Sequence, residues 1–204
     1  SVGKSSLLSA ITDTKSECAA YEFTTLTCIP GNLTINGVKI QMLDLPGIIE
    51  GAASGKGRGR EVIAVARSAD LVLMVLDAAR ESNNQHRNIL ERELETMGIR
   101  LNKRKPDVYF RKKAGGGIKF NATCPLTQLG DNPALTVDRI LHSYKLHHCE
   151  LLIREDVSVD EIIDVIEGNR CYIRCLYLYN KIDSISIEEV DELARKPNSL
   201  VISI

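Results

Sequence analysis

The feature that most constrains the fold is a pair of uninterrupted apolar runs. Residues 71–76 are apolar throughout and are followed by Asp77, and residues 175–179 are followed by Asn180. Strands buried on both faces of a mainly parallel sheet show such continuous apolar patterns. Segments with helical spacing alternate with these runs. The pattern predicts an α/β fold with a doubly wound, mainly parallel sheet, in which ligands lie beyond the carboxyl ends of the strands.

Local signals indicate the elements around these strands. Residues 4–12 have apolar side chains at helical spacing directly after a glycine. Two strand-like runs flank Asn36-Gly37, which is a strong hairpin signal, and Ser186 and Glu189 have the spacing of a capping box. We therefore expect a helix at the start of the sequence, then a β-hairpin, and a capped helix after the second apolar run.

Residues 100–168 interrupt this alternation, because the stretch is longer than an ordinary connection within one sheet. We predict an inserted α+β subdomain there, which divides the main domain into residues 1–99 and 169–204. Strand-like segments on either side of Gly115-Gly116-Gly117 predict a second hairpin. Between residues 100 and 119 stand eight lysines and arginines and one acidic residue, Asp107. Such a run either contacts RNA or forms an ordinary solvated face.

The composition narrows the class of protein. The formal net charge of −1 provides no global field that would attract nucleic acid or an acidic membrane, so any such contact has to be local. No apolar run approaches the roughly 20 residues of a membrane-spanning helix. Ser1 is not followed by the charged and apolar regions of a secretory signal, so we expect no secretion, and no two cysteines form a CxxC pair. We expect a cytoplasmic protein with no membrane association.

The first residues carry the first chemical motif. Ser1-Val2-Gly3-Lys4-Ser5 matches the second half of the phosphate-binding pattern G-x-x-x-x-G-K-[ST]. In this pattern backbone N–H groups and a helix N-terminus surround the phosphates, Lys4 reaches the β and γ phosphates, and Ser5 binds Mg²⁺. The first glycine of the pattern would precede Ser1 by three residues, so we interpret the chain as a fragment. An ordinary helix start is the alternative interpretation.

Two further motifs follow strands. Asp44-Leu45-Pro46-Gly47 ends the second hairpin strand, where a carboxylate can hold Mg²⁺ through water and the Gly47 N–H can meet a γ phosphate. Asn180-Lys181-Ile182-Asp183 ends the second apolar run, and a carboxylate there can accept both adjacent donors of guanine. An ordinary turn and a solvated strand end are the alternatives. The three motifs in this order predict a guanine-nucleotide site.

Longer segments carry a family resemblance over nearly the whole chain. They are residues 20–31, 44–52, 55–59, 62–67 and 168–170. These segments resemble the developmentally regulated GTP-binding proteins, nearer to the second paralogue, within the Obg superfamily of translation GTPases. The resemblance implies a P-loop NTPase fold and hydrolysis of GTP to GDP and phosphate. It also implies a conformational switch on ribosomes that acts with a dedicated zinc-finger-containing partner protein.

The resemblance also assigns roles to single residues. Thr25 would be the switch I threonine of the Mg²⁺ shell, and the insertion would be a module like domain 2 of ribosomal protein S5. Ile48 stands where other GTPases often have a catalytic glutamine, so another group has to position water, and the participation of a monovalent cation stays open. Lys4, Thr25 and Gly47 are the expected catalytic residues, and Ser5, Thr25 and Asp44 the expected Mg²⁺ ligands. The expected nucleotide contacts are Ser1, Val2, Gly3, Lys4, Ser5, Ser6, Phe23, Thr24, Thr25, Asp44, Pro46, Gly47, Asn180, Lys181, Asp183 and Ser203.

A rival hypothesis from another class is a ribosome- or RNA-binding scaffold with a vestigial nucleotide pocket. The basic run between residues 100 and 119 favours it. Magnesium-dependent release of phosphate from GTP distinguishes the two hypotheses.

Overall fold

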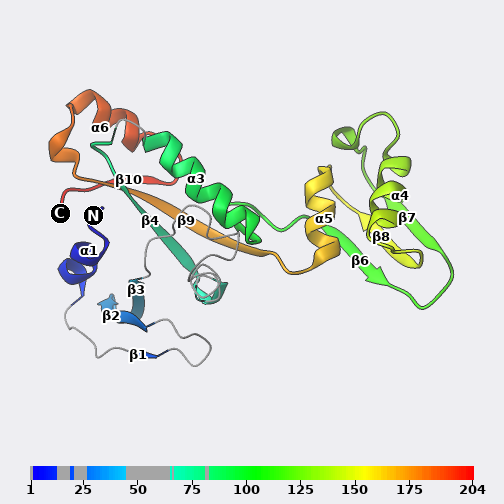
Figure 1. Ribbon diagram of the computed structural model, residues 1–204, viewed down its shortest axis with the longest axis horizontal. Helices are drawn as coiled ribbons and strands as arrows, with labels where there is room; N and C mark the ends of the chain where they lie inside the picture. Colours follow the sequence, from blue (N-terminus) through cyan, green and yellow to red (C-terminus); the bar gives the residue numbers. More distant parts are fainter. Residues whose placement is uncertain (1, 13–18, 21–26, 45–64, 66, 81–82) are drawn as a thin grey trace. The chain divides into compact units, whose positions relative to one another are not determined.

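The computed structural model describes residues 2–12, 19–20, 27–44, 65, 67–80 and 83–204 (Figure 1). The chain divides into two compact units, one formed by Ser1–Lys103 with Ile173–Ile204 and the other by Arg104–Tyr172. The insertion predicted at residues 100–168 overlaps the second unit, and its identity as an S5-like module stays a prediction. Within the described residues, no helix is both long and apolar enough to cross a bilayer.

The first unit contains the mainly parallel sheet that the apolar runs predict, and the predicted α/β class is confirmed. Strands β4 (Leu71–Asp77) and β10 (Ser199–Val201) run parallel to β9 (Cys171–Asn180), which lies between them. Strand β5 (Ile99–Leu101) also pairs with β9. Because Asp77 is in register with Asn180, the two apolar runs end at the same edge of the sheet.

Burial increases along β4 toward that edge. Leu71 is 45% exposed, whereas Leu76 is fully buried and Asp77 is 9% exposed. The uninterrupted apolar run predicts burial along the whole strand, but only its carboxyl half is well buried. The buried half leads directly into Asp77, so the packed core fixes the position of this polar residue.

Two helices of the first unit begin where the local sequence signals predict them. Helix α1 (Lys4–Ile11) begins after Gly3, and α6 (Ile187–Ala194) begins at a Ser186–Glu189 capping box, as predicted. The 3-10 helix η3 (Ile182–Ser184) follows β9.

Helix α3 (Asn83–Thr96) packs on β9 through Tyr177. The Tyr177 ring lies 3.6 Å from the Arg87 guanidinium, and its hydroxyl donates a hydrogen bond to Glu91.

The predicted hairpin around Asn36-Gly37 is confirmed. Strands β2 (Thr27–Ile35) and β3 (Val38–Asp44) pair antiparallel, and the short strand β1 (Ala19–Ala20) pairs with β2. Asn36 and Gly37 have φ angles of 51° and 81°, the left-handed values that a two-residue type I′ turn requires. The hairpin returns the chain to α1, so Asp44 at the end of β3 lies next to the first helix.

The second unit has a three-stranded sheet whose order differs from the prediction. Strand β8 (Cys149–Ile153) lies between β6 (Val108–Lys112) and β7 (Ile118–Ala122), antiparallel to β6 and parallel to β7. The predicted hairpin across Gly115-Gly116-Gly117 is therefore wrong. The glycine segment instead contacts His148, which immediately precedes β8. The Lys113 N–H donates to the His148 carbonyl, and the Gly117 N–H donates to His148 Nδ1.

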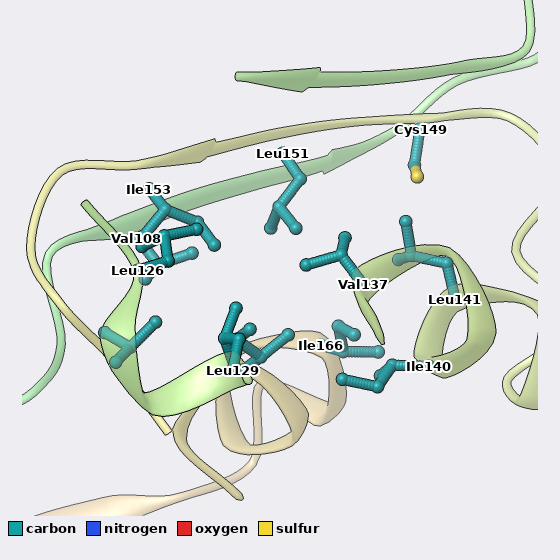
Figure 2. Packing of buried hydrophobic residues seen from close by; sticks show 12 residues of the cluster. Val108, Leu126, Leu129, Val137, Ile140, Leu141, Cys149, Leu151, Ile153 and Ile166 are labelled. Atoms are coloured by element: carbon teal, nitrogen blue, oxygen red, sulfur yellow. The ribbon is translucent and has the colours of Figure 1, made fainter. Parts of the chain in front are cut away.

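Apolar side chains between this sheet and its helices form the core of the second unit. Figure 2 shows Cys149 and Leu151 of β8 facing Val137 and Leu141 of helix α4 (Pro133–Ser143). The 3-10 helix η2 (Thr127–Leu129) adds Leu129, and helix α5 (Val159–Glu167) adds Ile162 and Ile166. Helix α5 begins at a Ser158–Glu161 capping box. All of these helices contribute to one core, on one face of the sheet.

Candidate functional site

The described site residues lie at the start of α1, at the ends of β3 and β9, and near the last residue of the sequence. They are Val2, Gly3, Lys4, Ser5, Ser6, Asp44, Asn180, Lys181, Asp183 and Ser203. Other predicted site residues lie outside the described residues, so their roles stay predictions. These are Ser1, Phe23, Thr24, Thr25, Pro46 and Gly47, and the same holds for Ile48.

Asn180, whose side chain is fully buried, joins several of these segments. Its Nδ2 donates to the Val2 carbonyl at 3.1 Å, and its Oδ1 accepts from the N–H groups of Lys181 at 2.8 Å and Ile204 at 3.0 Å. Its backbone carbonyl accepts from the Ala78 N–H, which follows β4, at 2.8 Å. One residue therefore ties the segment before α1 to two strand ends and to the last loop, and burial makes each of these bonds costly to lose.

Gly3 provides the space that this link needs. Its φ is 91°, and a Cβ at this position would lie 2.3 Å from Asn180 Nδ2. Another residue would therefore be strained in its backbone and would also collide with the Asn180 amide. Gly3 is the N-cap residue of α1 and offers no side-chain cap. Because the N-cap residue has no side chain that could accept from them, the first N–H groups of α1 are suited to bind an anion.

Lys181 contacts Asp77, which is not among the predicted site residues. The Lys181 Nζ donates to Asp77 Oδ2 at 2.6 Å, and Asp77 Oδ1 accepts from the Ala79 N–H at 3.1 Å. The hydrogen bond from Lys181 is the main reason why the pKa of Asp77 lies below its usual value, against the opposing effect of burial. The available signal was that Asp77 ends its apolar run as Asn180 ends the other. Lys181 has a left-handed φ of 67°, which turns the chain out of the strand.

Asp183, the predicted reader of guanine, is exposed and interacts with the last loop. Its Oδ1 accepts from the Ser203 hydroxyl at 2.5 Å and its Oδ2 from the Ser184 hydroxyl at 3.4 Å. The hydrogen bond from Ser203 is the main cause that lowers the pKa of Asp183, so its carboxylate is ionised near neutral pH. The structure thus brings Ser203 and Asp183 together, as expected for two parts of one base-binding site.

The predicted metal ligands Ser5 and Asp44 are also brought together. The Ser5 hydroxyl donates to Asp44 Oδ2 at 2.6 Å across a sequence separation of 39 residues. A hydroxyl and a carboxylate are the hard oxygen donors that suit Mg²⁺, which takes its remaining ligands from water and substrate phosphates. The described residues contain no cluster of three His, Cys, Asp or Glu side chains that could hold a metal alone. The half-buried Lys4 makes no ion pair with another described residue.

Comparison with known proteins identifies the family. Residues 1–112 match a family model described as a 50S ribosome-binding GTPase, and residues 115–204 match one described as the C-terminal region of the MMR_HSR1 domain. Over 203 residues the chain is 63% identical to developmentally-regulated GTP-binding protein 2 of Homo sapiens. It is 62% identical to developmentally-regulated G-protein 2 of Arabidopsis thaliana and 57% identical to the developmentally-regulated GTP-binding protein 2 homolog of Dictyostelium discoideum.

These alignments cover 100% of the chain and 50% to 54% of the relatives, so the chain spans about half the length of the curated relatives it matches. The match to the GTPase model includes residues 1–5, Asp44 and Asp77. It confirms the predicted P-loop fold class. The chain therefore belongs to the developmentally regulated GTP-binding protein family.

Proposed function

We propose that this protein is a magnesium-dependent GTP hydrolase that acts as a conformational switch on ribosomes. The observation that carries the proposal is the Asn180 link, which joins the segment before α1 to the loop that contains Asp183. The phosphates and the base of one nucleotide would bind to these two segments. Because their separation is already fixed, less conformational entropy is lost on binding.

Asp183 supports guanine as the base. An ionised carboxylate has acceptors only, and guanine presents two adjacent donors, N1–H and the 2-amino group. Adenine has no such pair of donors. Hydrogen bonds to a charged group contribute about 1.5 to 3 kcal/mol, so this pairing can account for a strong preference. Ser203 would keep the carboxylate oriented, because its hydroxyl already donates to Oδ1.

The phosphates would lie at the start of α1. Backbone N–H groups and the helix dipole favour an anion there, and Lys4 adds a positive charge. Ser5 and Asp44 would hold Mg²⁺, which neutralises charge on the phosphoryl group that is transferred. Thr25 and Gly47 would contact the γ phosphate and respond to its loss, which is the proposed basis of the switch.

The proposed contact with ribosomes or RNA uses the basic run. Lys103 pairs with Glu95 and Arg104 with Glu155, whereas Lys105, Lys112 and Lys113 have no ion pair with another described residue. The unpaired lysines can contact phosphates without first losing an intramolecular partner. A zinc-finger-containing partner protein and a cytoplasmic location complete the proposal.

Cosedimentation tests the ribosome contact. We expect weaker cosedimentation of the intact protein with ribosomes, and a smaller salt dependence, when glutamine replaces Lys103, Arg104, Lys105, Lys112 and Lys113. The reason is that fewer phosphate contacts release fewer counterions from the RNA on binding. GTP affinity should be retained. Cosedimentation that is unchanged across a salt series would show that these five residues form only a solvated face.

Phosphate release from GTP tests the enzymatic part. We expect turnover that depends on Mg²⁺, that is lost in Lys4→Ala, and that falls in Ser5→Ala when Mg²⁺ is limiting. Lys39→Ala is a suitable control, because Lys39 is an exposed lysine on β3 and is not a predicted site residue. Ribosome binding without any turnover would instead favour the scaffold with a vestigial nucleotide pocket.

A further inference from the structure

The sheet of the second unit has a second face, opposite to the core. Side chains alternate between the two faces of a strand, so Val108, Cys149, Leu151 and Ile153 belong to the core. The intervening residues form the other face, which we call the open face. It consists of Tyr109, Arg111, Lys119, Asn121, Glu150 and Leu152. The four residues on the outer strands are exposed, and the two on the central strand are half-buried.

The strand register arranges the open face in two rows. Leu152 pairs with Tyr109 on one side and Asn121 on the other, and these three residues form the first row. Glu150 pairs with Arg111 and Lys119, which makes the second row. Adjacent strands are about 4.8 Å apart, so the outer backbone positions of a row are about 10 Å apart. An aromatic and apolar row therefore borders a charged row.

The charged row has a net positive charge. Lys119 Nζ lies 3.3 Å from Glu150 Oε1, which is the one carboxylate of the open face. Arg111 has no ion pair with another described residue, and neither do Lys112 and Lys113, which follow it along the chain. The positive charge of Arg111 thus stays uncompensated within the described residues. This charge complements a polyanion.

Tyr109 is an exposed aromatic ring next to these cations. It is 43% exposed, and its hydroxyl makes no hydrogen bond to another described residue. Tyr144, the other exposed tyrosine of this unit, differs because its hydroxyl donates to Glu167 at 3.0 Å. Sheets that bind single-stranded nucleic acid combine exposed rings, on which bases stack, with cations that contact the phosphates. The open face has both.

We propose that the open face binds single-stranded RNA, with a base stacked on Tyr109 and phosphates bound by Arg111 and Lys119. Asn121, in the same row as Tyr109, offers an amide donor and acceptor to the base edge. The RNA is single-stranded because a base inside a duplex is already stacked on both sides and cannot reach a ring on a sheet surface. This inference rests on the RNA contact proposed above and adds to the lysines named there a defined surface, the open face, which carries Arg111 and Lys119 of the same basic run.

A binding titration with the intact protein tests this assignment. The probe is a fluorescein-labelled 12-nucleotide oligouridine, and the competitor is an unlabelled RNA duplex of the same length. Tyr109→Ala should weaken binding about 5-fold to 100-fold, the range for removal of one stacked base, while Tyr109→Phe should keep wild-type affinity. Arg111→Gln should weaken binding and reduce the salt dependence. Arg139→Gln, an exposed arginine on α4, is the matched control and should change neither.

The outcomes separate this inference from the proposed GTPase function. Thermal unfolding and phosphate release should be the same for Tyr109→Ala and wild type, because Tyr109 belongs to neither the core nor the nucleotide site. If wild type binds the oligonucleotide and Tyr109→Ala binds equally well, the open face is not the RNA site. Failure of wild type to bind the oligonucleotide, or equal competition by the duplex, would overturn the inference and leave the GTPase proposal intact. Loss of ribosome cosedimentation in Tyr109→Ala with unchanged oligonucleotide binding would assign the face to a protein contact and would also overturn it.

Discussion

Two regions of the molecule differ in how their polar side chains are held. One is the edge of the first unit where β4 and β9 end, which we call the strand-end edge, and the other is the open face of the second unit. At the strand ends, Asn180 is fully buried and Asp77 nearly so, and both are hydrogen-bonded to residues far away in the sequence. On the open face, Tyr109 and Arg111 are exposed and have no hydrogen bond or ion pair through their side chains to another described residue. The first region is preorganised, whereas the second is ordered mainly by its backbone.

This difference predicts how the two regions respond to substitution. A buried and hydrogen-bonded side chain contributes both to stability and to the geometry of its site, so its removal should impair folding and binding together. An exposed side chain without intramolecular partners contributes little to stability. Its removal should change only the binding of a partner. Pairs of matched substitutions, one in each region or one inside and one outside the site, test this distinction.

Asn180→Ala should have the largest effect on stability. It leaves the Val2 carbonyl and the N–H groups of Lys181 and Ile204 without their partner, and we expect the free energy of unfolding to fall by about 3 kcal/mol. GTP affinity should fall in parallel. Asn121→Ala on the open face is the control and should change the free energy of unfolding by less than about 0.5 kcal/mol. Urea unfolding with equal midpoints for both variants would remove the distinction between the two regions.

Gly3→Ala should have the next largest effect, and Gly37→Ala separates its two causes. Both glycines have a positive φ, but a Cβ at Gly37 would meet nothing within 4 Å, whereas one at Gly3 would reach the Asn180 amide. Gly37→Ala should cost about 1 kcal/mol of stability from backbone strain and leave GTP binding unchanged. Gly3→Ala should cost more and should also weaken GTP binding. Equal GTP affinity for the two variants in a nucleotide titration would contradict the role of Gly3.

Asp77→Asn should have a smaller effect that depends on pH. Because Lys181 lowers the pKa of Asp77 in the folded protein, the ion pair stabilises the fold fully above the ordinary carboxyl pKa of 3.8 and loses this effect as the pH falls through the lower folded value. At pH 7 we expect a loss of about 1 to 2 kcal/mol, and the difference from wild type should shrink below pH 4. Thermal unfolding between pH 3 and pH 7 measures this dependence.

Asp107→Asn provides the comparison in the second unit. Asp107 is paired with Arg154 at 3.3 Å, and both side chains are more than half exposed. Exposed pairs contribute little, so the loss at pH 7 should be below about 0.5 kcal/mol. A larger loss for Asp107→Asn than for Asp77→Asn would mean that burial does not determine the strength of these pairs.

Much of the strand-end edge can be predicted from the sequence, because local sequence patterns mark the ends of its strands. Continuous apolar runs followed by polar residues mark the ends of parallel strands, so Asn180 and Asp183 can be placed from pattern alone. Asp44 can be placed because its Asp-Leu-Pro-Gly motif follows a strand of the predicted hairpin. The Lys181–Asp77 pair could not, because it depends on the register of two strands separated by about a hundred residues. A side chain's partner across a sheet is a tertiary property.

The strand order of the second unit cannot be predicted from local patterns, because it also depends on contacts between residues far apart in the sequence. Gly115-Gly116-Gly117 between two strand-like segments is a correct turn signal, but it does not determine whether the strands are neighbours. Strand β8, more than 25 residues later, pairs with both of them and separates them. The open face follows from this order, because Tyr109 and Asn121 share a row only when Leu152 lies between them. No local pattern specifies such a surface.

The central claim is that the strand-end edge binds a guanine nucleotide through Asp183, and a competition experiment tests it most directly. GTP, ATP and xanthosine triphosphate compete for the intact wild-type protein and for Asp183→Asn. The asparagine amide replaces one acceptor by a donor, which opposes a donor of guanine but complements the 2-carbonyl oxygen of xanthine. We predict that wild type prefers GTP over ATP, and that the variant loses GTP affinity by orders of magnitude while it keeps or gains affinity for xanthosine triphosphate. Equal binding of ATP and GTP by wild type, or an unchanged preference for GTP in the variant, would contradict the claim.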